Sequence, residues 1–165
     1  MTNLTRILVP TDFSDASAAA LKYACDLADA LHAELCVLHV VEDPYPLGAY
    51  TEYYSPPPED FLVRQESQAR AQLETVLTPE QKARYHATLE LRSGHPVRQI
   101  LQYLSEHGAG HLVVMATHGR GGVARLMMGS VADKIVRMAP CPVLTVHHPQ
   151  REFVIPDALQ TVTKA

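Results

Sequence analysis

The chain has 165 residues, of which 47% are hydrophobic, and this fits one globular domain with a sizeable core. The formal net charge is −4 without a long run of one sign, which argues against nucleic acid or an anionic membrane as the main partner. The three cysteines form no C-x-x-C pair, so we expect neither a disulfide framework nor a cysteine-based zinc site. Residues 1–10 lack the apolar run of a signal peptide, and we expect a cytoplasmic protein.

Hydrophobic spacing predicts strands and helices that alternate along the chain. In chain order, we expect a strand at 7–9, a helix over 14–31, a strand at 35–41, and a helix over 60–77 with Leu62, Ala69, Leu73 and Val76 on one face. A further helical turn is expected from residue 78, because Thr78-Pro79-Glu80-Gln81 has the pattern of a capping box. The remaining expected elements are a half-exposed strand at 87–92 at a sheet edge, a helix after Pro96 with its apolar face running to Leu104, a strand at 112–115, a helix with Val131, Ile135 and Met138 on one face, and a strand at 143–146. Repeated alternation predicts a parallel sheet with helices on both faces.

Two segments do not fit this alternation. Residues 42–59 hold five prolines and four tyrosines, which predicts a long irregular loop. Residues 149–165 carry only a weak pattern and are expected to form a C-terminal tail. We therefore expect a single domain over 1–148 followed by the tail at 149–165.

In open parallel sheets, ligands bind beyond the carboxyl ends of the strands, where the strand order reverses. Two predicted strands end in unusual chemistry, the first in Pro10-Thr11-Asp12 and the fourth in the glycine-rich segment 116–130. Glycines let main-chain N–H groups turn toward a ligand, and the start of the following helix attracts anions. Arg120 and Arg125 would add positive charge, so the segment is a candidate phosphate site.

Other interpretations of the same residues stay open. The glycines within 119–122 could form an ordinary flexible loop, and Ser130-x-x-Asp133 is a capping box that needs no ligand. Asp12, Ser14 or Asp15 could cap the first helix, and Asp12 could instead contact a ligand hydroxyl or base. The segment contains no Walker P-loop, no G-x-G-x-x-G follows the first strand, and no G-x-S-x-G elbow is present.

Four segments, in this order, resemble the universal stress protein family. They are ILVPTDFSDASAAALKYACDLADAL, ELCVLHVVE, GHPVRQIL and HLVVMATHGRGGVARLMMGSVADKIVRMAPCPVLTV, and they cover most of residues 4–147. The resemblance implies a Rossmann-like fold with a five-stranded sheet in the order 3-2-1-4-5. The order reverses between strands 1 and 4, where the ligand is expected from the strand-end chemistry.

The resemblance also implies an adenine nucleotide as ligand. The nucleotide-binding branch of the family carries G-x2-G-x9-G-[ST], and here Gly119 and Gly129-Ser130 match its second half, whereas Ala116 replaces its first glycine. The implied ligand is ATP, ADP or AMP, with Mg²⁺ or Mn²⁺ held mainly by the phosphates. The implied contacts are Pro10, Thr11, Asp12, Val40, Met115 and Ala116 around adenine and ribose, and Gly119, Gly129, Ser130 and Val131 at the phosphates, with His118 and Arg120 beside them.

The expected function is that of a cytoplasmic nucleotide-binding stress-response regulator rather than an enzyme. The resemblance implies a homodimer that pairs through residues 143–146, an uncharged edge strand. Two alternatives stay open. One is a slow ATP hydrolase or phosphotransferase in which His118 orients or deprotonates water near the γ-phosphate, and the other is a dimeric interaction module that binds no nucleotide. We assign no metal site to the nine histidines, and His39 is interpreted as a core histidine with its hydrogen bonds satisfied.

Overall fold

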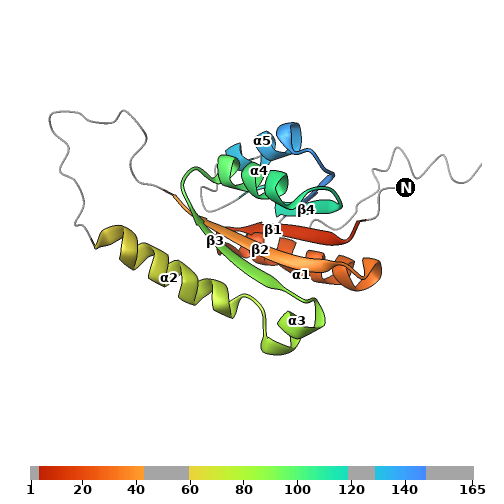
Figure 1. Cartoon of the computed structure of the whole chain (residues 1–165), viewed down its shortest axis with the longest axis horizontal. Coiled ribbons are helices and arrows are strands. Elements are labelled where there is room, and N and C mark those ends of the chain that lie inside the picture. The colour runs from red at the N-terminus through yellow and green to blue at the C-terminus, as the bar shows by residue number, and fades with distance from the viewer. Residues whose placement is uncertain (1–3, 43–59, 119–128, 148–165) are drawn as a thin grey trace, which may run out of the picture.

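The computed structural model describes residues 4–42, 60–118 and 129–147. Its strands are β1 (Arg6–Thr11), β2 (Glu34–Val41), β3 (Thr88–Ser93), β4 (His111–Ala116) and β5 (Val143–Val146), and its helices are α1 (Asp15–Leu31), α2 (Phe61–Thr75), α3 (Pro79–Arg84), α4 (Pro96–His107) and α5 (Ser130–Met138). The strands form one parallel sheet in the order β3-β2-β1-β4-β5 (Figure 1). This confirms the predicted fold class and strand order.

The two faces of the sheet carry two separate hydrophobic clusters, because successive strand residues point to opposite faces. On β1, Ile7 and Val9 belong to the cluster beneath α1 and α2, whereas Leu8 belongs to the cluster beneath α4 and α5. Both clusters reach residues with no exposed surface, such as Val37 on the first face and Ile135 on the second. Figure 1 shows α4 and α5 on one side of the sheet and α1 and α2 on the other. This is the doubly covered arrangement expected from the alternating elements.

Two predicted helix faces are wrong in detail. Leu62 is 40% exposed near the start of α2, and Met138 is 59% exposed at the end of α5, although both were expected on buried faces. Burial in α2 is confined to Ala69 and Leu73, near its contacts with β2 and β3. Apolar spacing predicts which face is apolar, but the neighbouring elements decide how far along a helix that face is covered.

The predicted edge strand is confirmed, since β3 lies at one end of the sheet and β5 at the other. Arg92 on β3 is more enclosed than an exposed strand face implies. Its side chain is 14% exposed, lies over the ring of Tyr103, and forms a 2.6 Å ion pair with Glu106 on α4. The arginine therefore covers the core with its stem while pairing its charge at the surface.

Three expectations lie outside the described residues: the tail at 149–165, the proline-rich loop except Glu42, and most of the glycine-rich segment, including Gly119, Arg120 and Arg125. Among the described residues, none of the helices combines the length and apolar character needed to cross a bilayer.

Candidate functional site

The strands β1 and β4 stop pairing partway along their length. β1 pairs with β4 only from Arg6 to Leu8, opposite His111 to Val113, although both strands continue beyond this point. On its other side, β1 stays paired with β2 as far as Thr11. Pro10 has no N–H to donate, which limits the hydrogen bonds available there. The strand order reverses at this pair, so the separation lies where a ligand is expected in an open α/β sheet.

The residues after β1 form a compact set of hydrogen bonds. Ser14 is the N-cap of α1, and its hydroxyl accepts a 3.2 Å hydrogen bond from the amide of Ser17. One carboxylate oxygen of Asp12 accepts hydrogen bonds from the Ser14 amide at 3.1 Å and from the Ser14 hydroxyl at 2.5 Å. Asp12 is therefore not the N-cap of α1, but its carboxylate holds Ser14, which is the N-cap.

Phe13 adopts a conformation that non-glycine residues rarely take. Its φ is +62°, in the left-handed region, which costs an aromatic residue about 1–3 kcal/mol. The Phe13 amide donates to the Thr11 hydroxyl at 3.1 Å, and its ring centroid lies 4.2 Å from that of His39. His39 Nδ1 in turn donates to the Thr11 carbonyl oxygen at 2.7 Å. The half-buried His39 thus has Nδ1 satisfied, as expected, and helps to hold a strained turn next to Asp12.

The residues after β4 connect three elements through Thr117. Its amide donates to the carbonyl oxygen of Val146 on β5 at 3.0 Å, and its carbonyl oxygen accepts from the amide of Gly129 at 2.7 Å. Its hydroxyl lies 2.9 Å from His118 Nδ1 and 3.2 Å from His147 Nδ1. These hydrogen bonds fix the position of Thr117 after β4. Among the described residues, the buried His118 Nε2 remains without a hydrogen-bond partner.

The start of α5 carries no side-chain cap. Its N-cap is Gly129, with φ −58° and ψ 149°, and Ser130 is already the first helical residue. The predicted capping box is therefore wrong: Asp133 instead forms a 3.1 Å ion pair with Arg137 one turn later. Helix starts have main-chain N–H groups without intrahelical partners, and here no side chain of the N-cap occupies them. This matches the donor arrangement that binds anions at helix N-termini.

The structure brings together part of the expected contact set. Thr11 ends β1 and Asp12 follows it, while Ala116 ends β4 and His118 lies two residues beyond it, so both groups lie at the same edge of the sheet. Of the remaining expected residues, Pro10 and Val40 are half-buried on neighbouring strands, and Met115 is 5% exposed within the core beneath α4 and α5. At the start of α5, Ser130 is exposed, and Gly129 and Val131 are half-buried. Gly119 and Arg120 lie outside the described residues.

Sequence reasoning missed three residues at this edge. Phe13 was hidden because a φ above zero in an aromatic residue has no sequence signature. Thr117 and His147 were missed because their contact joins residues 30 positions apart. The only available signal was register: both residues directly follow neighbouring strands, which places them at one edge.

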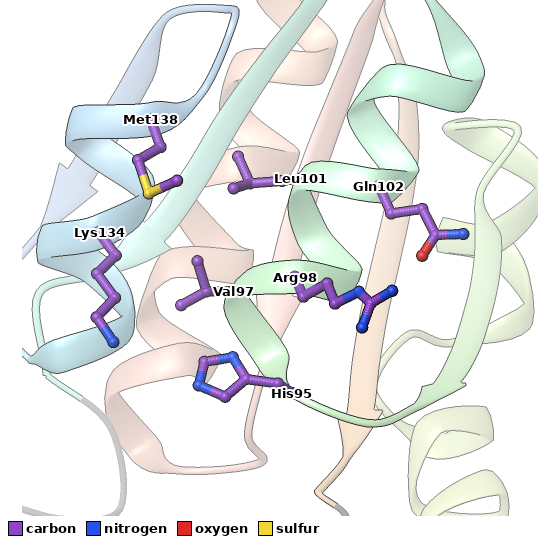
Figure 2. A pocket seen from close by; sticks show the side chains of 7 residues that line it. All are labelled: His95, Val97, Arg98, Leu101, Gln102, Lys134 and Met138. Atoms are coloured by element: carbon purple, nitrogen blue, oxygen red, sulfur yellow. The ribbon is translucent and has the colours of Figure 1, made fainter. Parts of the chain in front are cut away.

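A groove of about 690 Å³ lies between α4 and α5. Figure 2 shows Val97, Leu101 and Met138 as its apolar lining, with Arg98 and Lys134 at its rim. The exposed Met138 thus forms part of a groove instead of the buried face expected for it.

The parallel sheet, the two helical layers and the separation of β1 from β4 define a doubly wound, Rossmann-like α/β protein. The universal stress protein family model matches residues 3–147, and the chain belongs to that family.

Individual relatives agree with this assignment. The chain is 32% identical over 151 residues to a universal stress protein of Methanocaldococcus jannaschii, covering 89% of this chain and 84% of that protein. Universal stress protein UspA from Lactobacillus plantarum has a similar structure, with a TM-score of 0.68 and 26% identity over 88% of this chain and 99% of that one. A universal stress protein solved in complex with cAMP has a TM-score of 0.60 and 22% identity, covering 88% and 98% of the respective chains.

Proposed function

We propose that this protein is a regulatory nucleotide-binding protein of the ATP-binding branch, which holds an adenine nucleotide between the end of β1 and the start of α5. The observation that carries the proposal is the 2.7 Å hydrogen bond from the Gly129 amide to the Thr117 carbonyl oxygen. It holds the uncapped start of α5 against the end of β4, next to the point where β4 leaves β1. A phosphate placed there would accept hydrogen bonds from the main-chain N–H groups of the first turn of α5 and would interact with the positive end of the helix dipole.

Polar groups for the rest of the nucleotide lie on the β1 side of the same edge. Asp12 is half-buried and held by Ser14, so its carboxylate is positioned to accept hydrogen bonds from ribose hydroxyls. The cAMP-bound structural neighbour is consistent with an adenine nucleotide as the ligand class. A divalent ion would be held mainly by the phosphates of the nucleotide, as Mg²⁺ is in many nucleotide sites.

Release of bound nucleotide tests this proposal directly. Purified protein is heat-denatured, and the supernatant is analysed by chromatography with absorbance at the adenine maximum, alongside calorimetric titration with ATP, ADP and AMP. We expect a nucleotide in the supernatant or micromolar binding in the titration. Absence of both would favour the interaction module that binds no nucleotide.

A slow ATP hydrolase is the second candidate, and the observation that favours it is His118 Nε2, which has no hydrogen-bond partner among the described residues. Hydrolysis needs a group that orients or deprotonates water at the γ-phosphate. Phosphate release measured with wild-type protein and His118→Ala separates the two functions. Turnover that exceeds background and falls in the variant would support the enzyme, whereas background turnover in both supports the regulator.

We also propose a homodimer that forms through β5. This strand lies at the edge of the sheet, has four residues, and carries no charged side chain, so its outer edge can accept another strand. Sedimentation at micromolar concentration should show a dimer for the wild type and a monomer for Thr145→Lys, because charge on an edge strand disfavours pairing. A wild-type monomer would contradict the proposal.

A further inference from the structure

The hydroxyl of Thr117 lies between two imidazoles. His118 follows β4 and His147 follows β5, and the Nδ1 atoms of both rings lie within hydrogen-bond distance of Thr117 Oγ1, at 2.9 and 3.2 Å. Thr117 is only 2% exposed, and its main chain is fixed to β5 and to the start of α5. The three side chains therefore form a chain of hydrogen bonds in a fixed frame.

The number of hydrogens restricts this chain to two arrangements when both rings are neutral. A threonine hydroxyl has one hydrogen to donate, and a neutral imidazole carries its single hydrogen on one nitrogen only. If Thr117 donates to one Nδ1, the other Nδ1 must carry its hydrogen and donate to Oγ1. Two donating rings would leave the hydroxyl hydrogen unsatisfied in a buried residue, which costs free energy. The two rings are therefore in opposite tautomers.

The two arrangements differ at the Nε2 atom of His118. When Thr117 donates to His118 Nδ1, the Nε2 atom carries a hydrogen and can donate; in the other arrangement it presents a lone pair. This atom is buried and has no hydrogen-bond partner among residues 4–42, 60–118 and 129–147. The tautomer with hydrogen on Nε2 can therefore donate to an acceptor on a ligand. A phosphate oxygen is such an acceptor, and it would repel the lone pair of the other form.

We propose that Thr117 and His147 are positioning residues that hold His118 in the tautomer with hydrogen on Nε2, so that His118 donates to a phosphate oxygen of the bound nucleotide. The exposed His147 supplies the Nδ1 hydrogen that completes the chain. This inference rests on the proposed function and adds to it, because it makes two residues that do not contact the ligand responsible for recognising its anionic part. The ligand class is a nucleoside phosphate, as opposed to an uncharged nucleoside.

Binding of ATP and adenosine to two Thr117 variants tests the inference. Thr117→Val keeps the shape of the side chain and removes the hydroxyl, whereas Thr117→Ser keeps the hydroxyl. Because a hydrogen bond to a charged group contributes strongly, we expect Thr117→Val to weaken ATP binding roughly tenfold or more while adenosine binding stays within about twofold. Thr117→Ser should restore the ATP affinity to near the wild-type value.

The nitrogen NMR signals of the imidazole rings give a second readout, which a merely structural role would not change. In protein with ¹⁵N-labelled histidine and saturating ATP, we expect hydrogen on His118 Nε2 and on His147 Nδ1. In Thr117→Val, His147 should lose its preference for the Nδ1 tautomer.

The outcomes separate the inference from the proposed function. Wild-type protein that binds neither ATP nor adenosine would overturn the proposed function, and the inference with it. Wild-type protein that binds ATP, with an unchanged ratio of ATP to adenosine affinity in Thr117→Val, would overturn the inference alone. Hydrogen on His118 Nδ1 in the ATP complex would also overturn it.

Discussion

The amide of Gly129 donates a 2.7 Å hydrogen bond to the carbonyl oxygen of Thr117, across eleven intervening residues of the chain. The bond fixes the first turn of α5 against the last residues of β4. It therefore sets the position of the uncapped helix start relative to the side chains of Thr117 and His118.

Gly129→Glu should abolish nucleotide binding and leave the protein folded. The φ of −58° at Gly129 is open to any residue, so the main chain tolerates a side chain. The new carboxylate would occupy the anion position at the start of α5 and repel phosphate. Calorimetric titration with ATP should show no binding, and the unfolding free energy should change by less than about 1 kcal/mol. Gly129→Ala is the uncharged control, and loss of folding in both variants would contradict this view of Gly129.

Ala116→Gly should bind nucleotide as tightly as the wild type or more tightly, because it removes a Cβ at the end of β4. The same change should lower the unfolding free energy by about 1 kcal/mol, because Ala116 is 9% exposed and packs in the cluster beneath α1. Ala33→Gly removes a methyl group from the same cluster just before β2 and should lower stability without changing affinity. Weaker binding in Ala116→Gly alone would contradict the prediction.

Ser14→Ala should lower the unfolding free energy by about 1 kcal/mol through loss of the α1 N-cap. It also removes one hydrogen bond to the Asp12 carboxylate, which leaves that side chain less firmly held. Ser14→Thr keeps the hydroxyl and should stay within about 0.5 kcal/mol of the wild type. Urea unfolding of the three proteins checks this, and equal midpoints would show that another residue satisfies the helix start.

His111 should make the fold sensitive to acid. Its Nδ1 donates to the Gly108 carbonyl oxygen at 3.0 Å, and its buried Nε2 has no partner in the part of the chain that the structure describes. Burial lowers the pKa of His111 in the folded protein, and the nearby charges of Arg6 and His107 act in the same direction. The unfolded chain therefore binds this proton more readily, so stability is full above the ordinary histidine pKa and falls as the pH drops below about 6.5.

Thermal unfolding at about pH 7.5 and about pH 5.5 measures this effect. We expect His111→Gln to lose less stability between these values than the wild type. His95→Gln changes an exposed histidine at the start of α4 and is the matched control. An acid-induced loss in His111→Gln as large as in this control would contradict the assignment.

The sequence predicts the layered fold well because the fold depends on periodicity. The short apolar runs at 7–9 and 112–115 are buried strands at the centre of the sheet, and the capping box at Thr78 forms as expected. Local pattern was less informative at the site. Ser130 and Asp133 satisfy the capping-box pattern, yet Gly129 is the N-cap of α5, and its amide donates to the carbonyl oxygen of Thr117. Such tertiary contacts are invisible in a local window of sequence.

Leu8 and Val113 form the last pair between β1 and β4. Both are completely buried beneath α4 and α5. The boundary between paired and separated strands therefore lies in the core and not in the loops. A substitution that changes core volume there would shift the ends of both strands together. Under the proposed function, ligand affinity would therefore depend on core positions that no ligand touches.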